Sequence, residues 1–255
     1  MKEERRPLSH TQLSMYMDCP QKYAYRYVHG LPREPDSLSM LFSKHCIHPL
    51  VENLLLGRDY PDIYSAYMTN GGLNQAPFTP KTLSMVQDAL QPLLNSFMED
   101  YTVVNTETPI LDPTLNYLCI PDAVLEHTGT GKQIPLNIKM TSAYSTQHLT
   151  LPFDDQYLGQ TTLIHSNEII IILIQIHKTG YPVCDIVNIP ISTDLQEAWK
   201  RGVTQVYKDV QWNAITNTWL KNAPSSCYRF NKPCPYMTHC LGTEYDQKRR
   251  DPDAS

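Results

Sequence analysis

Three polar residues in the middle of the chain have the types and spacing of a site that binds a divalent metal ion. Asp122 lies near the start of one expected strand, and Asn137 and Lys139 lie near the end of the next, after a Gly-Thr-Gly turn. Residues two apart on a strand share a face, so Asn137 and Lys139 point the same way. Carboxylates hold Mg²⁺ or Mn²⁺ for phosphodiester hydrolysis, and a nearby lysine orients water or stabilises phosphate charge. The amide at position 137 supplies only a neutral oxygen, which weakens such a site.

Cysteines crowd into the last part of the chain. Three of the seven lie within residues 227–240, with six and then five residues between them: Cys227, Cys234 and Cys240. The odd count and the lack of a secretion signal disfavour a disulfide framework. The crowding favours metal or cluster ligation with a fourth ligand from elsewhere, although the spacing matches neither zinc ribbons nor bacterial ferredoxins. Three further cysteines lie in apolar or strand contexts and are expected to be packing residues: Cys46, Cys119 and Cys184.

The composition is that of an ordinary globular protein. Hydrophobic residues make up 41% and charged residues 18% of the 255 residues, which suffices for a full core. The net charge of −5 weighs mildly against nucleic-acid binding, but a small basic groove is compatible with an acidic exterior. The longest apolar run, at 169–174, is too short to span a membrane, and the first residues lack the apolar stretch of a secretion signal. We therefore expect a cytoplasmic protein with no membrane partner.

Hydrophobic periodicity predicts helices first and a sheet afterwards. The helices expected before the sheet span 9–28 with a break at Pro20, 41–56, and 80–100. The expected strands span 101–107, 115–126, 133–140, 168–177 and 183–191. Further helices are expected at 154–166, between the third and fourth strands, and at 193–222. This order predicts an α/β fold in one intertwined domain, with an N-terminal helical region over 1–100, a core sheet over 101–192, and a C-terminal helix and cysteine segment over 193–255.

Five motifs, taken in order, resemble the PD-(D/E)XK nuclease superfamily, in particular its RecB-like branch that carries an iron–sulfur cluster. Relatives of that branch include the AddB nuclease domain, the Cas nucleases of CRISPR adaptation and phage exonucleases. The motifs are LSHTQLSMYMDCPQKYAYRYVHGL at 8–31, the pair His48 and Glu52, IPDAVL at 120–125, LNIKM at 136–140 and DDQYLGQ at 154–160. The chain departs from the family at three positions: Pro121 stands where Gly is common, Asn137 where an acid is usual, and Gln160 where Tyr is usual.

The resemblance implies a restriction-endonuclease-like mixed central sheet flanked by helices, with a metal site on it. Mg²⁺ or Mn²⁺ would be bound by His48, Glu107, Asp122 and Asn137. Catalysis would depend on Asp122, Asn137, Lys139 and Gln156. Each of these residues also has a simpler explanation: a hydrogen-bonded helix histidine, a solvated acid or amide, or an ion pair between Asp122 and Lys139.

The resemblance also implies a [4Fe–4S] cluster in the C-terminal segment. Its ligands would be Cys19, Cys227, Cys234 and Cys240, which would join the two ends of the chain. Structural zinc on the same four thiolates and merely buried thiols are the alternatives.

Contacts to single-stranded DNA are expected from Gln156 and from aromatic residues near the N-terminus. Tyr16 and Tyr23 would stack on bases. Because a Tyr stripe at helical spacing is more often part of a core, packing is the alternative for both.

These features together predict a metal-dependent DNA nuclease. It would be an exonuclease acting on single-stranded ends in phage or bacterial replication, recombination or repair, with a replication or recombination protein as partner. Asn137 predicts that cleavage is impaired or lost. The alternative is a non-catalytic protein that keeps the nuclease fold and binds DNA or joins a complex. The sequence leaves open the cleavage polarity, DNA versus RNA, and the oligomeric state.

Overall fold

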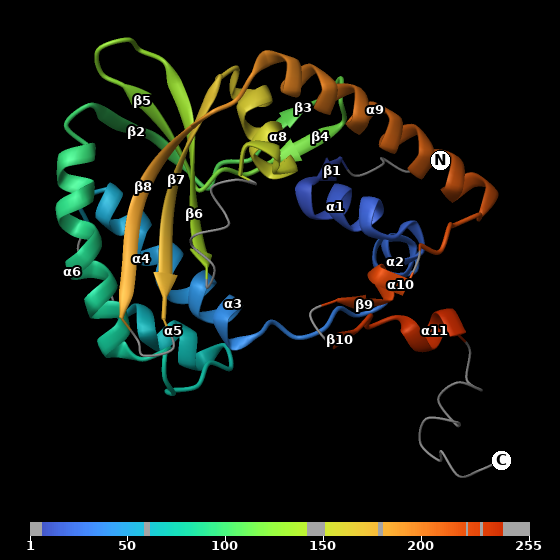
Figure 1. Ribbon diagram of the computed structural model, residues 1–255, viewed down its shortest axis with the longest axis horizontal. Coiled ribbons are helices and arrows are strands. Elements are labelled where there is room, and N and C mark those ends of the chain that lie inside the picture. The colour runs from blue at the N-terminus through green and yellow to red at the C-terminus, as the bar shows by residue number, and fades with distance from the viewer. Residues whose placement is uncertain are drawn as a thin grey trace. The chain divides into compact units, whose positions relative to one another are not determined.

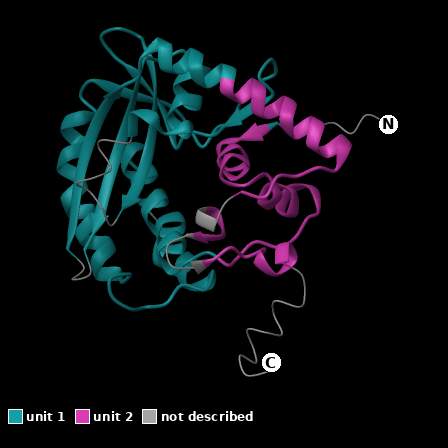
Figure 2. Ribbon diagram, turned by 45° about the vertical axis from the view of Figure 1, so that its right-hand side comes forward, with its two compact units in different colours: residues 1–7, 36–201 teal, residues 8–35, 202–255 magenta. Residues whose placement is uncertain are grey.

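The computed structural model describes residues 7–58, 62–141, 151–177, 181–222, 224–229 and 232–241. The chain divides into two compact units, coloured separately in Figure 2. Unit 1 contains residues 1–7 and 36–201, and unit 2 contains residues 8–35 and 202–255. The helix that carries His48 therefore belongs to the same unit as the strands that carry Asp122 and Asn137.

A five-stranded mixed sheet forms the centre of unit 1 (Figure 1). Its strands, in spatial order, are β2 (Tyr101–Thr106), β5 (Ala123–His127), β6 (Gln133–Thr141), β7 (Glu168–Ile176) and β8 (Pro182–Pro190). β6 and β7 run parallel, whereas every other neighbouring pair in this sheet is antiparallel. A parallel pair needs a crossover connection, and helix α8 (Asp155–Ile164) lies within the segment that joins β6 to β7.

β7 is the most apolar strand of the sheet. Its six consecutive residues Ile169–Ile174 are all fully buried, as expected for a strand covered on both faces. The register places Asn137 of β6 opposite Ile171 and Lys139 opposite Leu173. The polar residues of β6 are therefore held on a rigid, apolar support.

The helices of unit 1 contribute one face of its core. The helices that do so come before the sheet in the sequence: α3 (Leu38–Phe42), the π-helix η2 (Ser43–Ile47), α4 (His48–Leu55), α5 (Ile63–Thr69) and α6 (Pro80–Phe97). In α6 the buried residues Val86, Leu90 and Leu94 recur at four-residue spacing and pack in the same cluster as alternate isoleucines of β7, from Ile170 to Ile176. Deleting one such buried side chain typically costs about 2–5 kcal/mol.

The expected strand at 115–126 is two strands in the structure. Residues Tyr117–Cys119 form β4, which pairs with β3 (Ile110–Asp112), whereas β5 begins only at Ala123. Pro121 lies between them, and because proline has no N–H it cannot continue a ladder of hydrogen bonds. This break leaves Asp122 just before the first residue of β5.

Unit 2 is mainly helical. Its elements are α1 (His10–Asp18), α2 (Pro20–Tyr23), the π-helix η1 (Ala24–Val28), the later part of α9 (Thr193–Thr216), α10 (Pro224–Cys227), α11 (Met237–Leu241) and a short hairpin of β9 (Tyr228–Arg229) and β10 (Lys232–Pro233). Ser9 caps α1 in a reciprocal capping box with Gln12, and Pro20 starts the next helix at a position where proline is favoured. The predicted break at Pro20 is confirmed. Over the described ranges, no helix is long and apolar enough to cross a membrane.

Candidate active site and cysteine cavity

A cavity of about 330 Å³ in unit 1 collects most of the predicted site residues. The lining side chains come from α3, η2 and α4, from β6, and from the start of α8. They are Ser39, Met40, Ser43, His48, Asp122, Asn137, Ile138, Lys139, Met140, Gln156 and Tyr157. Residues far apart in the sequence thus share one cavity.

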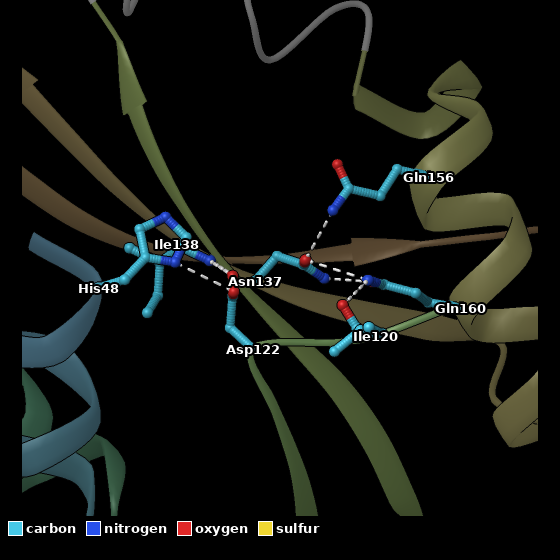
Figure 3. Close-up of polar contacts among 7 residues, drawn as sticks. All are labelled: His48, Ile120, Asp122, Asn137, Ile138, Gln156 and Gln160. Atoms are coloured by element: carbon cyan, nitrogen blue, oxygen red, sulfur yellow. Dashed lines mark hydrogen bonds and ion pairs between the residues drawn. The ribbon is translucent and has the colours of Figure 1, made fainter. Parts of the chain in front are cut away.

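Asp122 is fixed by both of its carboxylate oxygens (Figure 3). Oδ1 lies 3.1 Å from Nδ1 of His48, and Oδ2 accepts a hydrogen bond of 2.6 Å from the backbone N–H of Ile138. A short bond from a backbone donor orients a carboxylate firmly. Asp122 is therefore suited to serve as an acceptor or a metal ligand.

His48 takes its position from an unusual helix start. It is the first residue of α4 and directly follows the π-helix Ser43–Ile47, and its own N–H bonds to the carbonyl of Ser43. Pro49 comes next and cannot donate to a preceding carbonyl, so a widened turn at this point is the expected adjustment. Single π turns occur frequently at functional sites.

Asn137 is buried, with only 2% of its surface exposed, and its carboxamide bonds to two glutamine side chains. Its Oδ1 accepts bonds of 3.1 Å from Nε2 of Gln156 and 3.1 Å from Nε2 of Gln160, and its Nδ2 donates to Oε1 of Gln160. Because a carbonyl oxygen has two lone pairs, both positions on Oδ1 are taken. A metal ion at this oxygen would have to replace one of the two glutamines.

Helix α8 supplies both glutamines from one face. Asp154 caps the helix by accepting a bond of 2.9 Å from the N–H of Gln156. Residues four apart lie above one another on a helix, so Gln156 and Gln160 both reach toward Asn137. Figure 3 shows the two side chains extending from α8 to the same amide.

Lys139 lies beside a buried aromatic ring. Its Nζ is 6.0 Å from the centroid of the Tyr157 ring, at the outer limit of a cation–π contact. Tyr157 is fully buried, and its burial raises the pKa of the hydroxyl, with the charges of Asp154 and Asp122 acting in the same direction. The tyrosine thus remains neutral at physiological pH and presents an aromatic face to the lysine.

Three predicted residues are not among those that line this cavity. Glu107 is exposed, adopts a left-handed backbone conformation with φ of 45°, and is absent from the described residues that line the cavity. Tyr16 and Tyr23 belong to unit 2 and are buried there, with ring centroids 5.6 Å apart in an edge-to-face arrangement. The hydroxyl of Tyr16 accepts a bond of 2.9 Å from Asn213. Burial of both rings favours the packing alternative over stacking on bases.

The described residues at this site contain one carboxylate. Within the described ranges, no group of three or more His, Cys, Asp or Glu side chains is arranged to hold a metal ion. The available oxygen and nitrogen donors are those of Asp122 and His48, supplemented by neutral carboxamides. Oxygen and imidazole ligands suit Mn²⁺, and the single carboxylate makes the site a weak one for a hard dication.

The four cysteines of the predicted cluster line a second cavity, which lies within unit 2. Cys19, Cys227, Cys234 and Cys240 all contribute to its wall, and its volume is about 400 Å³. The backbone N–H of Cys234 bonds to the carbonyl of Cys227 at 2.7 Å, which closes the turn between them. All four are free thiols, and within the described ranges no three of them are arranged to hold a single metal ion.

The surroundings of this cavity are largely apolar and aromatic. Tyr25 lies on its wall with its ring 5.7 Å from that of Tyr236, and its hydroxyl donates to the carbonyl of His239 at 3.1 Å. Burial, with further contributions from neighbouring cysteines, raises the pKa of Tyr25 to about 12. Burial also raises the pKa of Cys234 above its ordinary value.

One comparison with a solved structure shows the fold of the chain. No protein-family model and no curated protein matches the chain. Among solved structures, an inferred exonuclease from Eubacterium rectale matches with a TM-score of 0.55 at 10% identity, over 93% of this chain and 94% of that chain. The chain has a restriction-endonuclease-like fold. The predicted fold class, a mixed central sheet flanked by helices, is thereby confirmed.

A second solved protein, the alkaline exonuclease LHK-Exo from Laribacter hongkongensis, matches with a TM-score of 0.35 at 12% identity, over 70% of this chain and 95% of that chain. The same protein in complex with dAMP gives a TM-score of 0.35 at 12% identity, over 68% of this chain and 94% of that chain. These two scores are too low for a comparison of folds.

Sequence reasoning missed several residues that line the first cavity or contact its lining. Gln160 was noted only as a departure from a motif, yet its side chain pairs with Asn137. Its four-residue spacing from Gln156 was the signal that places both on one helix face. Tyr157, Ser39 and Ser43 carry no sequence signal of their own, because their place on the cavity wall depends on how the helices pack.

Proposed function

We propose that this protein is a metal-dependent DNA nuclease whose cleavage is impaired. The observation that carries the proposal is a single cavity lined by Asp122 directly before β5, Lys139 of β6 and Gln156 of α8. The chain around it has a restriction-endonuclease-like fold. A fixed carboxylate, a lysine and polar amides around a space of this size are suited to holding a phosphodiester and its neutralising ion.

Asp122 and His48 are the residues that would hold Mg²⁺ or Mn²⁺. Their facing atoms lie 3.1 Å apart, and carboxylate and imidazole together form a donor set that accepts such ions. The bound ion would supply a nucleophilic water at neutral pH and neutralise charge on the phosphate. Glu107 would contribute as an outer carboxylate. Its backbone N–H donates to the carbonyl of Asp122, which keeps the two residues next to each other.

The other side chains act on the phosphate and on the geometry. Lys139 attracts the phosphate oxygens and stabilises negative charge as it develops. Gln156 holds Asn137 and offers a polar contact at the start of α8. The ring of Tyr157 restricts the positions open to Lys139.

The impairment follows from position 137. Asn137 offers a neutral oxygen where a carboxylate would attract the cation, and that oxygen already accepts two hydrogen bonds. The loss of a charged group acting at the reacting centre typically costs on the order of 10²–10³ in rate. We therefore expect weak or absent cleavage by this chain and retained affinity for DNA.

The proposed substrate is the end of single-stranded DNA. Because the Eubacterium rectale protein with the same fold is an inferred exonuclease, DNA ends are the first substrates to test. The proposed setting is the cytoplasm of a bacterium or a phage-infected host. A replication or recombination protein would be the partner there.

The proposed role of unit 2 is to carry a [4Fe–4S] cluster. Cys19, Cys227, Cys234 and Cys240 would ligate it through their thiolates, and the apolar wall of the 400 Å³ cavity would shield it from water. The cluster would connect α1 and α2 to the last segments of the chain, which restrains the unfolded state. Its function would be structural.

A second candidate is favoured by the hydrogen bonds of Asn137. A non-catalytic protein that binds DNA or joins a complex has no need of an acid at position 137, and the amide oxygen there already accepts bonds from both Gln156 and Gln160. The two candidates differ in one property, which is cleavage by the parent chain or by a variant that regains the acid.

The test uses single-stranded and double-stranded DNA with either the 5′ or the 3′ end blocked, in the presence of Mg²⁺ or Mn²⁺. The parent chain is compared with Asp122→Ala and with Asp88→Ala, which removes an exposed acid on α6. Slow metal-dependent degradation by the parent and Asp88→Ala, but not by Asp122→Ala, is the expected result. Degradation that persists in Asp122→Ala, or DNA binding that is absent in all three, contradicts the proposal.

A further inference from the structure

Asn137 and Gln160 form a closed, complementary pair of side-chain amides in the interior of unit 1. The Nε2 of Gln160 donates to Oδ1 of Asn137 at 3.1 Å, and the Nδ2 of Asn137 donates back to Oε1 of Gln160. Both side chains are almost completely buried, with 2% and 1% of their surface exposed. Each amide thus offers one donor and one acceptor to the other, with no water needed to complete the pair.

We infer that Gln160 is the residue that selects a neutral carboxamide over a carboxylate at position 137. The inference rests on the proposed function only for the importance of position 137 to cleavage. Gln160 does not line the cavity and acts through Asn137, so it is a positioning residue that sets which charge the site accepts.

The backbone of Ile120 fixes the orientation of the Gln160 amide. The Nε2 of Gln160 also donates to the carbonyl of Ile120 at 3.3 Å. Exchanging the positions of Nε2 and Oε1 would break this bond and place two carbonyl oxygens against each other, with the Ile120 oxygen left without this donor. The Oε1 of Gln160 is therefore held toward position 137 as an acceptor.

A carboxylate at position 137 conflicts with this arrangement. Its second oxygen would replace the Nδ2 of Asn137 and would face the Oε1 of Gln160, acceptor against acceptor. The conflict ends only when Gln160 turns over and loses Ile120, or when the new acid is protonated and donates to Oε1. Both routes disfavour the ionised form, so the amide at position 137 is matched to its surroundings.

The charged groups near position 137 do not remove this conflict. Lys139 lies on β6 itself. His48 at the start of α4 and Asp122 directly before β5 also line the cavity. Asp154 and Asp155 at the start of α8 add further negative charge. His48 and Asp122 contact each other at 3.1 Å. Asp154 and Asp155 would repel a new carboxylate.

The test is the thermal stability of Asn137→Asp as a function of pH, measured without metal or DNA. The carboxylate should lower Tm by about 5 °C at pH 8, and the loss should shrink toward pH 5, where the acid becomes protonated. Asn95→Asp is the matched control, because Asn95 is exposed on α6 and its Oδ1 accepts a bond of 2.8 Å from Gln91, which a carboxylate can also accept. The control should keep the Tm of the parent chain at both pH values.

A second variant tests the assignment to Gln160. The substitution Gln160→Lys supplies an ammonium group, which can donate to position 137 and to Ile120 without presenting an acceptor. Gln160→Lys should lower Tm in the parent background and raise it in the Asn137→Asp background. If Asn137→Asp does not fold at any pH, slow exchange of the Asn137 and Gln160 side-chain N–H protons in the parent supports the pair, and fast exchange overturns it.

An Asn137→Asp variant as stable as the parent at pH 8, or additive effects of the two substitutions, overturns the inference. Neither measurement includes cleavage, so the proposed function is unaffected by such a result. Conversely, an absence of nuclease activity in every variant leaves this inference in place.

Discussion

The Nδ1 atom of His48 and the Oδ1 atom of Asp122 lie 3.1 Å apart, although 74 positions separate the two residues in the sequence. His48 is held by the π turn that precedes Pro49, and Asp122 by the N–H of Ile138. Two independent elements of unit 1 thus converge to give the cavity its one acid and its histidine. This pair is where we expect a divalent ion to bind.

Removing either member of the pair should weaken metal binding. We expect Asp122→Ala to abolish Mn²⁺ binding and His48→Ala to weaken it by about 10- to 100-fold, because the acid supplies the charge and the imidazole only a neutral donor. Calorimetric titration with Mn²⁺ measures both. His45→Ala is the control, since His45 lies in the π-helix that directly precedes His48 and does not line the cavity. Unchanged affinity in Asp122→Ala would contradict the assignment.

Lys139 should contribute to DNA affinity through charge. Lys139→Met keeps much of the apolar stem and removes the ammonium, so affinity for single-stranded DNA should fall. The slope of log Kd against log salt concentration should decrease in magnitude by about 0.7. Titrations at several salt concentrations measure this change. Lys81→Met removes the same charge from an exposed position on α6 and should leave the affinity and the slope unchanged. Equal effects of both variants would show that DNA responds only to overall charge.

The proposed cluster predicts that iron is bound in the cavity lined by the four cysteines of unit 2. Anaerobically purified parent protein should contain iron and sulfide in comparable amounts, and Cys234→Ser should lose both together with much of its thermal stability. Cys184→Ser is the matched control, because Cys184 lies on β8 in unit 1 and is remote in sequence from the four lining cysteines. Stoichiometric zinc without sulfide in the parent would replace the cluster with a zinc site.

The buried thiols of unit 1 should make the protein less stable in alkali. Burial raises the pKa of Cys46 and of Cys119 to about 12 and that of Cys184 to about 11. In the unfolded chain these thiols ionise near their ordinary pKa of about 8.5. Because the native pKa is raised, the stabilisation is complete below about pH 8.5 and is lost as the pH rises toward 11.

Urea unfolding at pH 8, 9 and 10 measures this loss, which approaches about 1.4 kcal/mol per pH unit for each thiol that ionises only on unfolding. Cys119→Ala removes one such thiol, so its free energy of unfolding should decline less steeply with pH than that of the parent. Parallel curves for the two proteins would show that Cys119 ionises in the native state.

The sequence predicted the elements of the site better than their contacts. The strand at 133–140 and the helix at 154–166 follow from periodicity and from the acidic start of the helix, and both are present as β6 and α8. The break at Pro121 was missed, because the apolar residues on its two sides read as one strand. The short elements β3 and α5 were missed for lack of a full period.

The pairing of Asn137 with Gln160 lay beyond the sequence for a physical reason. It depends on the side-chain conformations of two residues brought together by the crossover from β6 to β7, and on the carbonyl of Ile120, which orients one of them. The burial of Tyr16 and Tyr23 likewise depends on how helices pack, which helical spacing alone does not determine. The convergence of four cysteines on one cavity was expected from motif order, and the occupant of that cavity remains a proposal.

The most direct test of the account is cleavage of end-labelled single-stranded DNA by Asn137→Asp at pH 8 with saturating Mn²⁺, which favours the ionised acid. The account predicts a gain on the order of 10²–10³ over the parent chain, lost again in the double variant Asn137→Asp with Asp122→Ala. An Asn137→Asp protein that is folded and binds both Mn²⁺ and DNA, yet cleaves no faster than the parent with any substrate end, would contradict the nuclease assignment and establish a non-catalytic binding protein.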